Sequence, residues 1–207
     1  KQGGDINLDK CYYINNGVDI EDFNNQKELN VLNDSDLSND KFNVVYTGAI
    51  RPVNNVGNIL DAAIILKEHT DIQFLIYGEG NQLEILKQRI IDEGISNVKM
   101  KGYVDKKYMP YVLSKSSVNI LNYSQSKYNW SRGNSSNKLF EYMASGKPII
   151  STVKMGYCPL EKYKCGLSLE KDKPEFLADA ILKIFDMPGE KYKEMSSNAI
   201  LGARDFD

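Results

Sequence analysis

The sequence has few of the residues on which metal sites, disulfide scaffolds and histidine chemistry depend. Its 207 residues include three cysteines and one histidine. A small, odd number of cysteines argues against a disulfide framework and fits a reducing cytoplasm. Their spacing is not that of a structural zinc site, so no metal is expected. The one histidine, His69, lies in a polar turn and is expected at the surface, which excludes a histidine dyad within this chain.

Long hydrophobic runs and an excess of positive charge are also missing. No uncharged apolar segment approaches the roughly 20 residues that a membrane-spanning helix needs. Lys and Arg number 26 and Asp and Glu 28, giving a formal net charge of -2, which disfavours a nucleic-acid-binding protein. Residues 1–5 are polar, lack an initiator Met and do not resemble a signal peptide, so we expect a piece of a longer chain.

What the sequence does contain is a regular alternation of short β-rich runs and segments with apolar residues at helical spacing. Such an order predicts an α/β domain with a doubly wound parallel sheet. The predicted strands are 42–47, 72–77, 98–101, 117–122, 148–152 and 166–169, and the predicted helices are 55–68, 83–90, 106–115, 137–145, 174–185 and 190–204.

We expect three parts along the chain. Residues 1–41 are interpreted as an inter-domain segment, in which the Asn-, Asp- and Ser-rich stretch 24–41 forms a flexible loop. Residues 42–188 form the Rossmann-like domain, and residues 189–207 form a C-terminal helix. Ligands of such sheets bind at the carboxyl ends of the strands.

The most informative motif is the segment 135–150. Small polar residues precede a predicted helix, whose free backbone N–H groups can face an anion. A cation at that end, Lys138, is unfavourable unless an anion such as phosphate neutralises it. Glu141 lies one turn further on and can accept two hydroxyl hydrogen bonds, as from a ribose. The alternative is a capped helix with a Lys–Glu surface pair, and these residues alone favour neither interpretation.

The local charge adds a second indication. Residues 99–138 contain eight lysines and arginines but one acidic residue, which suits an anionic ligand, an acidic membrane surface or a solvated face. Tyr123, Tyr128 and Trp130 fall in the same region, where they can stack on a base or sugar or pack a loop. The turn 78–80 lacks the third glycine of a dinucleotide fingerprint, which disfavours a nicotinamide enzyme.

Five segments, taken in order, resemble the C-terminal, donor-binding half of a family 4 retaining glycosyltransferase with the two-domain GT-B fold. They lie at 13–23, 45–48, 76–80, 98–104 and 141–148. The motif S-x-N-K-L-F-E-Y-M-A-S-G-K-P resembles in particular a bacterial branch that builds surface polysaccharide such as capsule.

This resemblance implies the site residues. Glu141 would hold the ribose, the turn 102–104 would meet the base, and the helix start 136–139 would lie beneath the diphosphate. Arg51, displaced within its turn, and Lys138 would stabilise the departing nucleotide. The implied catalytic residues are Arg51, Lys138 and Glu141, and the implied donor-binding residues are Gly48, Gly78, Gly102, Tyr103, Val104, Arg132, Gly133, Ser136, Asn137 and Leu139.

The sequence departs from the family at Gly133, where the first glutamate of the family's E-x7-E pair would stand. Arg132 or backbone N–H groups near Gly133 could replace its contact to the donor sugar.

The expected substrate is a nucleotide-diphosphate sugar, with a UDP-sugar favoured and no cofactor. This fragment would bind it but not transfer it, because the N-terminal acceptor domain is absent. The resemblance further implies a glycan or lipid-linked acceptor, and a cytoplasmic protein that can lie at the inner face of the membrane. The alternatives are a sugar-nucleotide epimerase of the same fold and a non-catalytic nucleotide-sugar-binding module.

Overall fold

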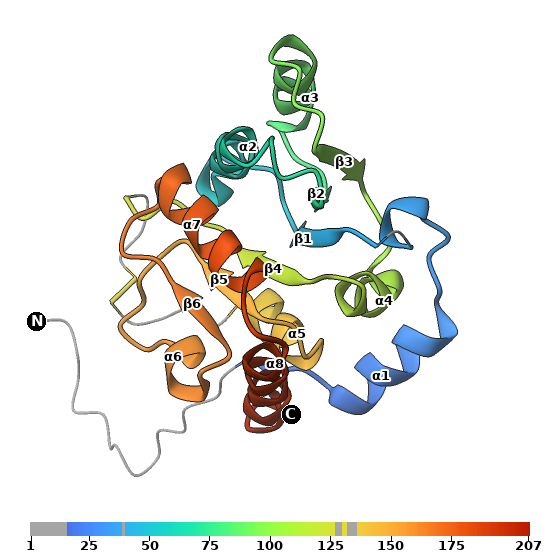
Figure 1. The fold of residues 1–207 in the computed structure, drawn as a ribbon. Helices are drawn as coiled ribbons and strands as arrows, with labels where there is room; N and C mark the ends of the chain where they lie inside the picture. Colours follow the sequence, from blue (N-terminus) through green and yellow to red (C-terminus); the bar gives the residue numbers. More distant parts are fainter. Residues whose placement is uncertain (1–15, 39, 127–129, 132–135) are drawn as a thin grey trace, which may run out of the picture.

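The computed structural model describes residues 16–38, 40–126, 130–131 and 136–207. Its centre is a six-stranded sheet in the order β3-β2-β1-β4-β5-β6, in which every pair is parallel (Figure 1). This confirms the predicted doubly wound sheet. The strands are β1 (Phe42–Thr47), β2 (Ile72–Tyr77), β3 (Val98–Gly102), β4 (Val118–Leu121), β5 (Ile149–Ser151) and β6 (Gly166–Ser168).

Helices cover both faces of the sheet, and a separate hydrophobic core lies between the sheet and the helices on each face (Figure 1). Neighbouring strand residues such as Val44 and Val45 enter opposite cores, because successive side chains of a strand point to opposite faces. One face carries α2 (Val56–Ile65), α3 (Leu83–Asp92) and α7 (Pro174–Phe185). The other carries α1 (Ile20–Leu29), α4 (Met109–Ser114), α5 (Asn137–Ala144), α6 (Pro159–Tyr163) and α8 (Gly189–Arg204). The described residues also form short 3₁₀ turns, which are η2 (Ser35–Leu37), η3 (Pro52–Asn54) and η4 (Lys106–Tyr108).

The prediction of a flexible loop over residues 24–41 is wrong, because this stretch contains the second half of α1 and the whole of η2. The Asp19 carboxylate starts α1 by accepting the Asp22 N–H at 2.8 Å, as an N-cap residue does. Phe23, on the inner side of α1, is 5% exposed and belongs to the core. The short helix α6 was likewise not predicted.

The segment after α1 is held by a small polar cluster. The ammonium of Lys101 lies 2.8 Å from carboxylate oxygens of both Asp34 and Asp36. The hydroxyl of Tyr77 donates to Asp34 at 3.1 Å. Partners 40 to 70 positions away in the sequence thus fix a stretch whose composition alone indicated a loop.

The two ends of the described chain lie side by side. The Val18 N–H donates to the Phe206 carbonyl at 3.0 Å, and the Ile20 N–H donates to the Asp207 carboxylate at 3.0 Å. The last turn of α8 therefore ends beside the start of α1. The division of the chain into 1–41, 42–188 and 189–207 stays a prediction.

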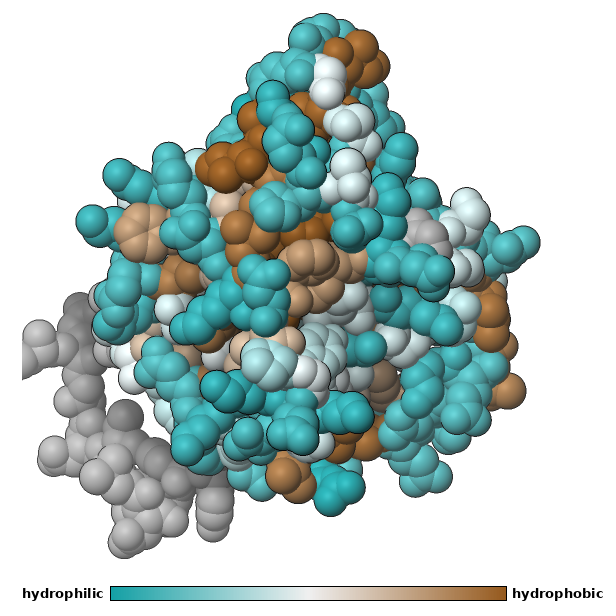
Figure 2. All heavy atoms as spheres, viewed as in Figure 1, coloured by the Kyte–Doolittle hydropathy of each residue, from teal (hydrophilic) through white to brown (hydrophobic). Residues whose placement is uncertain are grey.

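The face drawn in Figure 2 is mainly hydrophilic, with hydrophobic residues in scattered groups, some of them over α3. Ile85 and Ile91 of α3 are both largely exposed. No helix within the described residues is long and apolar enough to cross a membrane. His69 is exposed, as expected.

Candidate functional site

A pocket of about 460 Å³ lies at the carboxyl edge of the sheet, where β1, β2 and β3 end and α5 begins. This is the edge at which open α/β sheets bind their ligands. The lining residues are Thr47, Gly48, Ala49, Tyr77, Gly78, Glu79, Tyr103, Val104, Lys106, Met109, Asn137, Lys138 and Glu141.

Three glycine turns form one side of this pocket. The Gly48 N–H donates to the Tyr77 carbonyl at 2.9 Å, and the Gly78 N–H donates to the Gly102 carbonyl at 2.7 Å. Gly48, Gly78 and Gly102 have φ values of 135°, 142° and 70°, which side chains rarely adopt. A Cβ at Gly78 would also lie 1.9 Å from the Gly48 carbonyl oxygen. The turns therefore bring bare backbone to the edge where a ligand would sit.

Lys138 is the central cation of the pocket. Its ammonium nitrogen lies 4.4 Å from the ring centre of Tyr46 and donates to that tyrosine's hydroxyl at 3.4 Å. Burial lowers the pKa of the ammonium to about 8, and the nearby charge of Glu141 only partly opposes this effect. No carboxylate of the described residues lies within 4.0 Å of it. The site thus holds a poorly solvated cation that a bound anion would stabilise.

Helix α5 aims its N-terminus at the same pocket. Asn137, its first residue, is exposed and lines the pocket. The buried hydroxyl of Tyr142 fixes the helix to the end of β1, because it accepts the Thr47 N–H at 3.0 Å. The first N–H groups of a helix have no partner within it, so this end can bind an anion.

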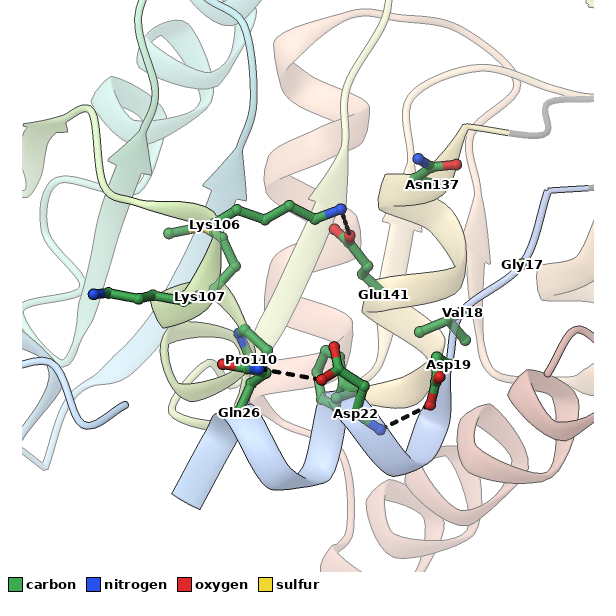
Figure 3. A pocket seen from close by; sticks show the side chains of 12 residues that line it. Gly17, Val18, Asp19, Asp22, Gln26, Lys106, Lys107, Pro110, Asn137 and Glu141 are labelled. Atoms are coloured by element: carbon green, nitrogen blue, oxygen red, sulfur yellow. Dashed lines mark hydrogen bonds and ion pairs between the residues drawn. The ribbon is translucent and has the colours of Figure 1, made fainter. Parts of the chain in front are cut away.

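Glu141 lies one turn along α5, with its side chain 23% exposed. The ammonium of Lys106 approaches its Oε1 to 3.7 Å, and Figure 3 shows Lys106 reaching from η4 toward this carboxylate. Lys138 and Lys106 both line the pocket with Glu141. The site therefore combines two lysines, two glutamates (Glu79 and Glu141) and a helix N-terminus.

Most of the residues implied by the resemblance meet here. Gly102 adjoins the pocket through its hydrogen bond with Gly78, and Ser136 is the N-cap residue of α5. Arg51 is exposed after β1 and does not line the pocket. Leu139 is fully buried in the core, and its N–H donates to the Ser136 carbonyl, so neither group faces the pocket. Arg132 and Gly133 lie outside the described residues. Those that line the pocket are Gly48, Gly78, Tyr103, Val104, Asn137, Lys138 and Glu141.

The basic run 99–138 contributes less to the pocket than its charge indicated. Among its described members, Lys106 and Lys138 line the pocket, whereas Lys101 pairs with two aspartates elsewhere. The rings of Tyr123 and Trp130 lie 5.0 Å apart and pack on each other, as in the loop-packing alternative. Tyr128 lies outside the described residues.

Sequence reasoning missed several described residues of the site, among them Tyr46, Tyr142 and Met109. Tyr46 flanks Lys138, Tyr142 anchors α5, and Met109 lines the pocket from the start of α4. Tyr142 directly follows Glu141 in the recognised motif, which is a usable signal. Tyr46 and Met109 come from other elements, and nothing in their local pattern distinguishes them from core residues.

A parallel sheet in the order 3-2-1-4-5-6 with a pocket at its carboxyl edge defines a Rossmann-like domain. The chain belongs to the glycosyl transferases group 1 family, whose family model matches residues 30–201. This match confirms the resemblance stated from the sequence.

Individual relatives agree with this assignment. The chain is 28% identical over 194 residues to a Bacillus subtilis (strain 168) protein, TuaH, named as a teichuronic acid biosynthesis glycosyltransferase; the match covers 92% of this chain and 46% of TuaH. The structure of Anabaena HepE in complex with UDP and glucose has a TM-score of 0.68 at 17% identity, over 92% of this chain and 51% of HepE.

A third comparison fixes which half is present. The C-terminal domain of the group 1 glycosyl transferase LpcC from Francisella tularensis has a TM-score of 0.66 at 18% identity, over 91% of this chain and 97% of that domain. This chain therefore has the fold of a C-terminal GT-B half. It spans about half the length of TuaH and HepE.

Proposed function

We propose that this chain is the donor-binding half of a bacterial glycosyltransferase and that it binds a UDP-sugar. In the whole protein, the sugar passes with retention to a glycan or lipid-linked acceptor during surface-polysaccharide assembly. One observation carries the proposal: the poorly solvated Lys138 lies in the first turn of α5, one turn before Glu141, and both line the pocket. The UDP in the HepE complex favours uracil as the base. The name of TuaH favours a surface polysaccharide as the product.

Each part of the nucleotide has a group of pocket residues suited to bind it. The diphosphate lies against the N-terminus of α5, where backbone N–H groups and Lys138 bind its oxygens. The ribose hydroxyls donate to Glu141, and the base lies over the turn at Tyr103 and Val104. The absence of a side chain at Gly48 lets the Lys138 ammonium lie close to the turn after β1, because a Cβ there would come within 2.6 Å of it.

The same groups stabilise the departure of the nucleotide. When the bond from the sugar to the β-phosphate oxygen breaks, negative charge grows on that oxygen and on the diphosphate. Lys138 and the α5 N-terminus stabilise this charge more in the transition state than in the bound substrate, which is what lowers a barrier. Arg51, exposed in the turn after β1 and outside the pocket lining, is a candidate further cation. The acceptor attacks the face from which the nucleotide leaves, so the configuration is retained.

Calorimetric titration of the chain with UDP, GDP and ADP tests the binding half of this proposal. We expect UDP to bind most tightly. Glu141→Ala should weaken UDP binding about tenfold or more, because a carboxylate bound to hydroxyls contributes about 1.5–3 kcal/mol. Glu170→Ala is the matched control, since Glu170 is 67% exposed and pairs with Lys154. Equal effects of the two substitutions would contradict the ribose assignment.

Transfer needs the longer protein. Sugar transfer by the full-length protein separates an enzyme from a non-catalytic nucleotide-sugar-binding module. NMR of the product shows whether the anomeric configuration of the donor sugar is retained. We expect transfer with retention.

A further inference from the structure

A second pocket of about 410 Å³ borders the first and is enclosed by α1, α5 and the turn η4 with the start of α4 (Figure 3). Its floor includes the apolar side chains of Phe23 and Pro110, and the polar groups of Asp22 and Gln26 lie on α1. The two pockets share four lining residues, which are Lys106, Met109, Asn137 and Glu141. The Lys106–Glu141 ion pair therefore stands at the junction of the pockets.

The backbone that carries Lys106 is capped, and its side chain is largely exposed. The Asp105 carboxylate caps η4 by accepting the Lys107 N–H at 3.4 Å, so the turn is held. The Lys106 side chain is 80% exposed and its ammonium lies 3.7 Å from Glu141 Oε1. The adjacent Lys107 points away from the junction, with its ammonium 5.1 Å from the ring centre of Tyr108 (Figure 3).

We propose that Lys106 is a positioning residue for nucleotide binding, which acts by holding and neutralising the carboxylate of Glu141. The inference rests on the proposed function, in which Glu141 accepts the ribose hydroxyls. Neither the recognised motif nor the glycine turns includes Lys106, and its role comes from the ion pair alone.

Two physical effects favour this role. An ammonium on Oε1 restricts the carboxylate and leaves Oε2 available to the ribose, so less freedom is lost when the nucleotide binds. A carboxylate without a partner would also repel the diphosphate that binds Lys138 one turn away. An exposed ion pair contributes little to folding, so its removal should leave the fold intact while it changes binding.

The test compares Lys106→Met with Lys107→Met by calorimetric titration with UDP. We expect Lys106→Met to weaken binding by about 3- to 10-fold and Lys107→Met by less than about 2-fold. Lys106→Arg should restore most of the affinity, because it restores the ion pair. Thermal unfolding of each variant checks that the fold is intact.

Two further measurements show whether Lys106 acts through Glu141. In a Glu141→Gln background, Lys106→Met should have almost no effect on UDP affinity, since the carboxylate that it orients is gone. The loss caused by Lys106→Met should also shrink for 2′,3′-dideoxy-UDP, which lacks the hydroxyls that Glu141 accepts.

The outcomes separate the two proposals. If the unmodified chain binds UDP but Lys106→Met behaves like Lys107→Met, the inference about Lys106 is overturned and the proposed function stands. The same holds if the loss is equally large in the Glu141→Gln background. If the unmodified chain binds no nucleoside diphosphate, the proposed function and this inference are both overturned.

Discussion

At the scale of single residues, Lys138 is poorly placed for stability and well placed for binding an anion. A positive charge at a helix N-terminus is unfavourable by about 0.3–1 kcal/mol, because the backbone amides there already carry positive charge. Burial against Tyr46 adds a desolvation penalty, seen in the pKa of about 8. A bound diphosphate would relieve both penalties at once.

This position predicts a pH dependence of nucleotide binding. The diphosphate binds the charged form of Lys138 and so raises its pKa. Affinity for UDP should therefore be highest below the pKa of about 8 in the free chain and should fall as the pH rises through it. Binding at about pH 8.5 should take up most of one proton, measured by calorimetry in two buffers with different ionisation enthalpies.

Lys138→Met provides the check on the source of this proton. It should weaken binding and abolish the proton uptake, whereas Lys154→Met, on the exposed side chain paired with Glu170, should leave the uptake unchanged. Persistent uptake in Lys138→Met would assign the titration to another group.

The sequence was informative about those site residues that lie close together along the chain. Lys138 and Glu141 are one helical turn apart in one motif, so their shared face follows from helix geometry. The partners that set their properties, Tyr46 and Lys106, come from β1 and η4. Only the folded arrangement of these elements brings them within reach, and no local pattern encodes those contacts.

At the scale of elements, the attachment of α5 to β1 decides where the helix N-terminus points. Tyr142 is fully buried, and its hydroxyl accepts the Thr47 N–H at 3.0 Å and lies 3.1 Å from the Thr47 hydroxyl. β1 ends at Thr47, immediately before the glycine turn at Gly48. The strand end, the glycine turn and the helix start are thus held as one unit.

Removal of this hydroxyl should loosen the unit. Tyr142→Phe leaves the buried Thr47 N–H without its acceptor, and we expect the free energy of unfolding to fall by about 1–3 kcal/mol in urea denaturation. UDP affinity should fall as well. Tyr163→Phe is the control, because the Tyr163 hydroxyl pairs with the exposed Asp205 and should contribute less than about 1 kcal/mol. If both substitutions lowered the free energy of unfolding equally, the Tyr142 hydroxyl would not be a special anchor of α5 to β1.

The cluster that anchors η2 predicts a pH-dependent stability. Burial disfavours the Asp34 carboxylate, but hydrogen bonds from Lys101, the Asp36 N–H and Tyr77 hold its pKa below the ordinary 3.8. A lowered pKa in the folded state adds stability that is present above 3.8 and disappears as the pH falls through the folded value.

Asp34→Asn should therefore destabilise the chain by about 2 kcal/mol near neutral pH, measured by urea denaturation. The difference from the unmodified chain should shrink as the pH falls below about 4. Glu84→Gln removes an 81% exposed partner of Lys87 and should have little effect at any pH. A destabilisation by Asp34→Asn that does not change with pH would show that the charge of Asp34 is not its source.

The strands and most helices could be predicted, whereas α1 could not. A buried parallel strand is a short apolar run, and such runs followed by glycine are legible in the sequence. In α1, Phe23 is the one buried residue, so the helix shows almost no apolar stripe. Its N-cap at Asp19 is a local signal, but the Lys101 anchor of the following segment is a long-range contact.

At the scale of the whole molecule, the strand order places three glycine turns and the start of α5 at one edge. β1 lies in the middle of the sheet between β2 and β4, and α5 begins the crossover from β4 to β5. The alternation of strands and helices predicts a parallel sheet, and the carboxyl ends of parallel strands meet at one edge, so this edge could be predicted. The chain spans about half the length of TuaH and HepE. Under the proposed function, this edge of the sheet binds the donor nucleotide.

A crystal structure of the chain with UDP tests the central claim most directly. We expect the diphosphate within hydrogen-bonding distance of the backbone N–H groups of Asn137 and Lys138 and of the Lys138 ammonium, with the ribose hydroxyls on Glu141. A diphosphate bound away from the N-terminus of α5, with the Lys138 ammonium still against Tyr46 and out of contact with the phosphates, would contradict the account.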